Sequence, residues 1–208
     1  MCIRDRTYRN LGKDHALAGD EESAVRCFRR SIDCGPVPTA SPAVQARDRL
    51  DDAWACSLLA QLERRRGAWD EAERWYLQAI ATRESTPLTP GDQMDHWRDL
   101  AGLGVAMVRT GRVDEGLAFI QEMLPESGAP AANLVAAKAL LTIAEWLADQ
   151  PDHSTANTYG LQVNALQRLR AAWQQGHEAA REFTLHELKD ALSAAPEYHE
   201  LVGQMTGS

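Results

Sequence analysis

The sequence has little of what a membrane-spanning or strand-rich protein needs. Its uninterrupted apolar runs are only a few residues long, such as Ala139–Leu141, whereas a bilayer-spanning helix needs about 20. Aromatic residues are few: six Trp, four Tyr and three Phe among 208 residues. β-Branched residues are sparse beside Ala, Leu, Glu, Gln and Arg, a bias that favours helices over strands. The sequence therefore predicts an all-α fold with no transmembrane helix.

Positive charge is also scarce. Lys and Arg number 22 against 30 Asp and Glu, which gives a net charge of −8. A general electrostatic grip on nucleic acid or on an anionic membrane is therefore not expected. The hydrophobic fraction of 44% is still enough to bury a continuous core, so we predict a folded soluble protein that binds neither nucleic acid nor membrane.

Motifs for catalysis and metal binding are missing as well. The sequence contains no phosphate loop, nucleophile elbow or dinucleotide fingerprint, and His186–Asp190 has an Asp where the zinc-protease helix motif needs its second His. The cysteines, Cys2, Cys27, Cys34 and Cys56, form no Cys-x-x-Cys pair, and we interpret them as small hydrophobic residues. We expect no enzymatic activity, no metal and no cofactor. Four free thiols fit a reducing compartment, which favours a cytoplasmic location, and the alternative is a periplasmic setting with one disulfide.

What the sequence does contain is an internal repeat. Two small residues stand 12 positions apart in four successive segments: Gly12 and Ala24, Ala60 and Ala72, Gly104 and Gly116, Ala144 and Ala156. A turn residue follows the first of each pair by seven positions: Gly19, Gly67, Gly111 and Pro151. Two helices approach closely where one presents Gly or Ala to the other, so each segment predicts a helical hairpin. Close contacts are expected between Gly12 and Phe28 and between Ala60 and Tyr76.

A single hairpin cannot bury its apolar face alone, so we predict an α-solenoid of about four stacked hairpins. Successive repeats are offset by 48, 44 and 40 residues, and the extra length lies between them. Ser41–Pro42 has the pattern of an N-cap followed by Pro at the first helical position, which predicts an unusually long helix from Pro42 to just before Gly67. Thr89–Pro90 is expected to open the next repeat in the same way.

The order of these residues resembles a known repeat. Tyr8-x-x-Leu11-Gly12-x-x-His15, followed by Ala24-x-x-x-Phe28 and Pro36, resembles the tetratricopeptide signature. With its extended helices, the phrase from Leu59-Ala60 through Gly67 to Tyr76 resembles the long-repeat class, which includes kinesin light chains and the sensor arrays of bacterial multidomain regulators. The resemblance covers residues 7–165 and weakens in the fourth repeat.

The remaining segments are assigned separately. Met1–Arg6 resembles the translation of a sequencing adapter, so we expect residues 1–6 to be an artefact outside the fold and the natural start to lie upstream. Residues 166–208 are expected to be capping helices and a tail. Their helical stripes are two: Leu161, Ala165, Leu169 and Trp173 before Gly176, then Leu185, Leu188, Leu192 and Ala195 before Pro196.

The resemblance implies a concave groove lined by the first helix of each hairpin. The implied groove residues in the first three repeats are Arg9, Lys13, Trp54, Gln61, Arg64, Arg65, Arg98 and Arg109. Those in the fourth are Lys138, Glu145 and Asp149. We expect the six cations of the first set to form one positive surface that binds an acidic or C-terminal peptide, with Trp54 as a hydrophobic anchor. The alternative is that these Arg and Lys side chains only solvate an exposed helix face. Arg9 and Lys13 stand where the chaperone-tail clamp of some relatives has Lys and Asn, so that clamp is not reproduced.

Two functions fit this sequence. The first is a protein–protein interaction scaffold that binds a peptide or helical segment of another protein in its groove. The second is the regulatory or sensor segment of a larger bacterial signalling protein, a transcription regulator or a kinase, whose effector domain lies upstream. An upstream kinase, nucleotide-binding or helix-turn-helix domain would distinguish the second from the first.

Overall fold

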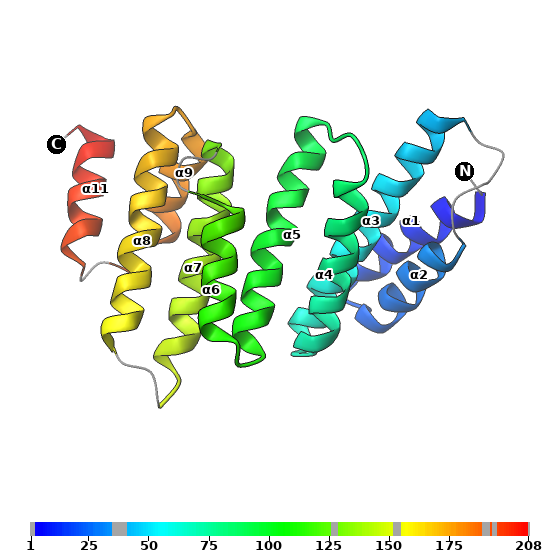
Figure 1. Ribbon diagram of the computed structural model, residues 1–208, viewed down its shortest axis with the longest axis horizontal. Coiled ribbons are helices and arrows are strands. Elements are labelled where there is room, and N and C mark those ends of the chain that lie inside the picture. Colours follow the sequence, from blue (N-terminus) through cyan, green and yellow to red (C-terminus); the bar gives the residue numbers. More distant parts are fainter. Residues whose placement is uncertain are drawn as a thin grey trace. The chain divides into compact units, whose positions relative to one another are not determined.

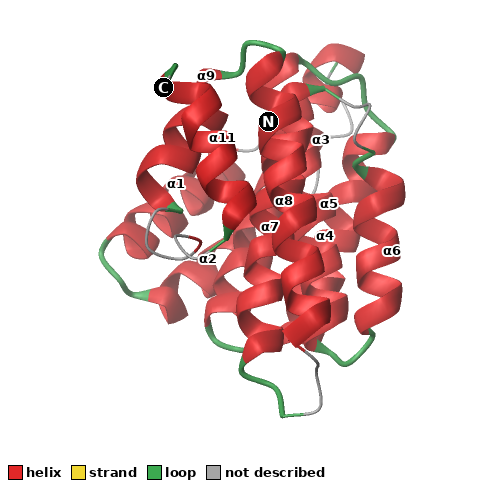
Figure 2. Ribbon diagram, turned by 90° about the vertical axis from the view of Figure 1, so that its left-hand side faces the viewer, coloured by secondary structure: helices red, strands yellow, loops and turns green. Residues whose placement is uncertain are grey.

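The computed structural model describes residues 3–34, 41–125, 129–151, 155–188, 192 and 195–207. Within these residues every regular element is a helix (Figure 2). The chain divides into two compact units, Met1–Val113 and Asp114–Ser208. The prediction of an all-α fold built from helical repeats is confirmed.

The first unit contains five helices. These are α1 (Ile3–Leu17), α2 (Glu21–Asp33), α3 (Pro42–Arg65), α4 (Trp69–Glu84) and α5 (Pro90–Arg109). Helix α1 packs on α2 and α3 packs on α4, which makes the first two predicted hairpins (Figure 1). Contacts between α2 and α3, and between α4 and α5, join the hairpins to each other and to the next helix.

The helix boundaries follow the predicted capping and turn residues. Ser41 accepts a hydrogen bond from the Val44 amide at the start of α3, with Pro42 in the first turn. Thr89 forms a capping box with Asp92 at the start of α5. The three predicted turn glycines are left-handed, with φ of 78° at Gly19, 76° at Gly67 and 91° at Gly111. A side chain is strained in that conformation, so glycine allows the tight reversal between helices.

The small residues of the repeat are buried at helix contacts. Gly12, Ala60, Gly104 and Ala144 are all buried, as predicted. A Cβ built on Gly12 would lie 2.8 Å from Cε1 of Phe28, which confirms that expected contact. The ring of Tyr76 lies against Gly102 of α5, where an added Cβ would be 2.7 Å from its Cε1. The sequence interpretation had placed Tyr76 only against Ala60 and gave Gly102 no role.

The contact between Gly102 and Tyr76 makes a testable prediction. Alanine in place of glycine in a helix interior ordinarily stabilises by about 0.5–1 kcal/mol. At Gly102 the new methyl group would overlap the buried ring of Tyr76, so we expect Gly102→Ala to lower the free energy of unfolding by about 1–3 kcal/mol. Urea denaturation measures this change.

Gly160 on helix α8 (Thr155–Gln174) provides the matched control. No heavy atom lies within 4 Å of a Cβ built there. Gly160→Ala is therefore expected to raise the free energy of unfolding by about 0.5–1 kcal/mol. If both substitutions stabilised the protein, the close packing of Tyr76 on Gly102 would be wrong.

The second unit contains the remaining helices. These are α6 (Val113–Met123, which begins at the boundary between the units), α7 (Pro130–Ala148), α8, α9 (Glu178–Glu182), the π-helical turn η1 (Phe183–Glu187) and α11 (Pro196–Thr206). Helices α7 and α8 pack as a hairpin, α9 packs on α8, and α11 also contacts α8 (Figure 1).

The structure defines the helices at the two ends of the chain. The domain boundary expected at residue 165 falls inside α8, because the stripe from Leu161 to Trp173 continues the second helix of the α7–α8 hairpin. Pro196 lies in the first turn of α11, whereas the sequence pattern indicates only that it follows the helical stripe from Leu185 to Ala195. Residues 3–6 form the first turn of α1. Residues 1 and 2 lie outside the described part of the chain.

Helix α7 bears on the expectation of no transmembrane helix. By length and composition Pro130–Ala148 would be able to cross one, since its apolar residues are interrupted only by single polar ones. More than half of this helix is buried inside the protein, against α8 among others. The core helix of a helical bundle has the same length and composition, so this finding is weak evidence for a membrane span.

The cysteines of the first unit differ in their environments. Cys56 is buried, Cys27 is half-buried and Cys34 is exposed. Burial is the main cause that raises the pKa of the Cys56 thiol to about 12. Cys56 therefore packs as a small apolar residue, as interpreted from the sequence.

Candidate peptide-binding surface

The predicted groove residues of the first three repeats all lie on α1, α3 and α5 of the first unit. Their exposure differs widely. Lys13, Gln61, Arg65 and Arg98 are exposed, Trp54, Arg64 and Arg109 are half-buried, and Arg9 is buried. The structure therefore separates these residues into groups with different roles.

Arg9 is a structural residue. Its side chain is 6% exposed, and its Nη1 atom lies 3.0 Å from Oδ2 of Asp51 on α3. The ion pair holds the middle of α1 against α3. Arg9 is thus enclosed by its ion pair with Asp51 and is not open to a ligand. The repeat pattern alone does not show which carboxylate lies opposite it.

Two of the exposed cations are neutralised locally. Arg65 Nε lies 3.1 Å from Oε1 of Glu21 on α2, and Arg98 Nη1 lies 3.0 Å from Oδ1 of Asp95, one turn earlier on α5. An ion pair of this kind cancels much of the field of each cation. With Arg9, three of the six cations expected in one positive surface therefore face carboxylates.

Lys13 and Trp54, both expected in the groove, lie in contact. The Lys13 ammonium lies 4.1 Å from the centroid of the Trp54 ring, a cation–π contact between α1 and α3. The other side of the indole meets the core, with its ring centroid 6.2 Å from that of Phe28 in an edge-to-face arrangement. Trp54 therefore lies at the border between the core and the surface.

The surface around Trp54 continues along α3. Residues four and seven positions apart share one face of a helix, which places Leu58 and Gln61 beside Trp54. Leu58 is half-buried against the same core, and Gln61 is exposed. We call this set, Lys13, Trp54, Leu58 and Gln61, the α1–α3 face. Leu58 was not among the predicted site residues, although its spacing from Trp54 could have indicated it.

Arg64 follows Gln61 by three residues on α3. Its positive charge acts on the phenol of Tyr76 and lowers the pKa of that group, but burial dominates and raises the Tyr76 pKa to about 12. The phenol is therefore neutral at physiological pH. Arg64 is half-buried next to the contact between α4 and α5.

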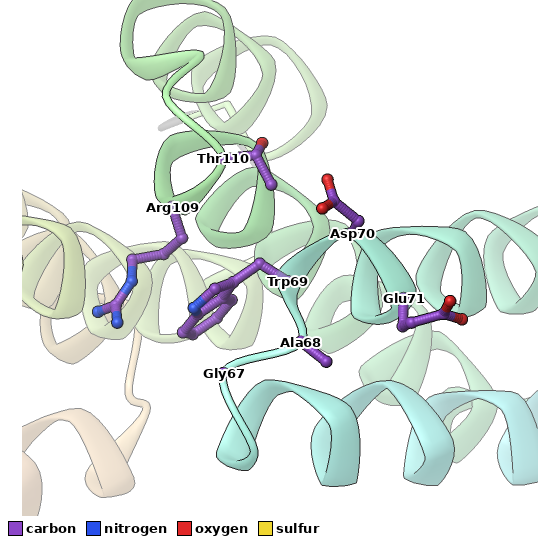
Figure 3. Close-up of a pocket in the computed structure, with 7 residues that line it drawn as sticks. All are labelled: Gly67, Ala68, Trp69, Asp70, Glu71, Arg109 and Thr110. Carbon is purple, nitrogen blue, oxygen red and sulfur yellow. The ribbon is translucent and has the colours of Figure 1, made fainter.

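Arg109, the last residue of α5, lines an open pocket (Figure 3). Its guanidinium lies 4.3 Å from the centroid of the Trp69 ring, and burial lowers its pKa without removing the charge. The open pocket has a volume of about 380 Å³ and is lined by Gly67, Ala68, Trp69, Asp70, Glu71, Arg109 and Thr110. Glu71 points away from Arg109 and pairs with Arg74. Arg109 is thus joined to the turn between α3 and α4.

A buried polar cluster fixes the three helices that carry these residues. Arg83 on α4 forms an ion pair with Asp99 on α5, and the side chains of both are 2% exposed. The Ser57 hydroxyl on α3 lies 3.0 Å from Oδ2 of Asp99 and 3.0 Å from Nη1 of Arg83. Burial raises the pKa of Asp99 to about 7, although Arg83 and Ser57 both lower it. This cluster, which the sequence interpretation missed, sets the position of α3 relative to α4 and α5.

Of the three residues expected from the fourth repeat, Lys138 and Glu145 lie on α7 of the second unit and Asp149 is the C-cap of that helix. Lys138, Glu145 and Asp149 are all exposed. The Lys138 ammonium lies 4.2 Å from the centroid of the Phe183 ring in η1. This contact is a cation–π pair within the second unit.

The geometry defines a helical repeat scaffold whose clearest chemical surface combines an aromatic ring with a cation. The family model described as "Tetratricopeptide repeat" matches residues 53–86, which cover most of α3 and all of α4. This match supports a protein of tetratricopeptide type, as the sequence predicted. No curated protein matches the chain. Tetratricopeptide repeats typically act as non-enzymatic scaffolds that bind other proteins, and this role is suggested here as well.

Proposed function

We propose that the α1–α3 face binds a peptide or helical segment of another protein. The observation that carries the proposal is the Lys13 ammonium over the half-buried ring of Trp54. Within the described residues, Lys13 has no carboxylate partner. Tryptophan is one of the residue types that supply much of the binding energy at protein interfaces.

The face suits a segment with an apolar side chain beside an acidic one. Trp54 and Leu58 offer apolar area, and Lys13 can form a charge-assisted hydrogen bond with a carboxylate. Gln61 can donate to and accept from a peptide backbone. The acidic character of the ligand depends on Lys13 and Arg64, because Arg9, Arg65 and Arg98 already face carboxylates.

A displayed library of random peptides, selected against the purified full chain, tests this proposal. Peptides rich in acidic and apolar residues are expected. Trp54→Ala and Lys13→Glu should each weaken the selected peptides at least tenfold in a fluorescence anisotropy titration. Higher salt should also weaken them, because exposed charge pairs are screened over about 8 Å at physiological ionic strength.

Arg26→Glu is the matched control, since Arg26 is 62% exposed on α2 and pairs with Glu22. It makes the same kind of charge change on the second helix of the hairpin and should leave the affinity unchanged. Peptides that bind equally well to the Trp54→Ala, Lys13→Glu and Arg26→Glu chains would contradict the proposal.

A further inference from the structure

The last helix, α11, is held against the second unit by one apolar face. Tyr198, Leu201 and Met205 are 5%, 0% and 5% exposed. Their spacing of three and four residues places them on the same face of the helix. Helix α11 thus buries three anchors, as an amphipathic helix does in a groove.

Acidic side chains accompany two of these anchors. The Tyr159 hydroxyl donates to Oε1 of Glu197 at 2.7 Å, and Arg170 Nη2 donates to Oε1 of Glu200 at 2.9 Å. Glu197 directly precedes the anchor Tyr198 in the sequence, and Glu200 directly precedes Leu201. Both donors lie on α8, so one helix forms hydrogen bonds with both acidic side chains.

The helix is also held by contacts to α9 and η1. The Tyr198 hydroxyl donates to the Thr184 carbonyl in η1 at 3.3 Å. Arg181 Nε on α9 donates to the Met205 carbonyl near the end of α11 at 3.2 Å. Four residues therefore hold α11 by hydrogen bonds, three through their side chains and Thr184 through its backbone carbonyl. We call these residues the α8–η1 seat: Tyr159, Arg170, Arg181 and Thr184.

We propose that the α8–η1 seat is a second protein-binding site, which α11 occupies until a helix of a partner protein displaces it. The partner helix has the pattern acidic-aromatic-x-acidic-Leu-x-x-x-Met, in which a similar apolar residue can replace the Met. The pattern is that of Glu197–Met205, the segment that the seat already accepts.

The contacts of α11 allow displacement. Tyr159 and Glu200 are exposed, and surface ion pairs contribute little to stability, so three apolar anchors supply most of the attachment. The α7–α8 hairpin beneath is held by a long buried stripe on each helix. Segments with few buried contacts open at the lowest free energy, which makes α11 the part of this unit that can leave while the hairpin persists. This site is independent of the α1–α3 face.

The test uses full-length chains and a fluorescein-labelled peptide with the sequence of residues 195–207. In the wild-type chain the attached α11 competes with the peptide and keeps its apparent affinity low. Leu201→Ala weakens the attached helix while the peptide keeps its leucine. We expect this chain to bind the peptide at least tenfold more tightly than the wild-type chain does.

A second variant keeps the test valid if Leu201→Ala unfolds the unit. Glu200→Arg places an arginine opposite Arg170 without making a cavity, and it should increase peptide affinity several-fold. In the Leu201→Ala chain, Arg170→Glu should weaken the peptide, and a peptide with Glu200→Arg should regain the affinity. Gln167→Glu, an exposed charge change on α8, is the control that should have no effect.

Three results would overturn the proposal. The first is equal peptide affinity for the wild-type, Leu201→Ala and Glu200→Arg chains. The second is a peptide affinity that does not respond to the charge exchange at position 170. The third is a dimer of the Leu201→Ala chain in light scattering, which would show that copies of the chain exchange α11 among themselves.

Discussion

Replacement of Asp99 by leucine is expected to lower the free energy of unfolding by about 3–5 kcal/mol at pH 8, where the carboxylate is charged. The substitution leaves the Arg83 guanidinium buried without its counter-ion, because the side chain is only 2% exposed. Ser57 still faces Arg83, but a hydroxyl cannot neutralise a buried charge. Urea denaturation of the full chain measures the loss.

The double variant Arg83→Leu/Asp99→Leu separates the cost of an unpaired charge from the net contribution of the pair. Two leucines should recover most of the stability, since a buried ion pair gains little over apolar packing. Asp95→Ala is the control, because it breaks the exposed pair with Arg98 on the same helix and should cost less than about 1 kcal/mol. Equal losses at Asp95 and Asp99 would show that the Asp99 pair is not buried.

Ala72→Arg is expected to cost about 4 kcal/mol or more. Ala72 is 0% exposed in the contact between α3 and α4, so a larger side chain must displace the helices and its charge must leave water. The same position is the small residue of the second helix in the predicted repeat. The measurement therefore also tests the repeat register, by thermal or urea denaturation.

Leu77→Arg provides the comparison on the same helix. Leu77 is 49% exposed, and a charged residue there should change the free energy of unfolding by no more than about 0.5 kcal/mol. A loss at Ala72 as small as that at Leu77 would mean that the register of α4 is wrong.

The hairpins were predictable because their signals are local. The spacing from Gly12 to Ala24 and from Ala60 to Ala72, with a turn glycine between, is set by two helices in contact, and the caps at Ser41 and Thr89 need only neighbouring residues. Helix α11 was missed although Pro196 and the spacing of its three anchors indicated it. That segment lies outside the repeat, so the pattern of the repeat carried no information about it.

The candidate site was less predictable, because a helix-face pattern does not show which carboxylate lies opposite a cation. Arg9 and Lys13 are four residues apart on α1, yet one is buried against Asp51 and the other lies over Trp54. Arg83 follows the buried positions Tyr76, Ala79 and Ile80 at helical spacing. An arginine on the buried face of α4 was therefore the sequence feature that could have indicated a buried ion pair.

The length of α3 has a consequence for how the first unit unfolds. At about 1.5 Å per residue its 24 residues span about 36 Å, against about 20 Å for the 13 residues of α2. It contacts both α2 and α4, so one helix contributes to two neighbouring cores. In an ideal repeat array each repeat can melt with only the loss of its own interfaces. Melting either of the first two hairpins here would expose apolar surface of the other, and this coupling favours a single cooperative transition over fraying one repeat at a time.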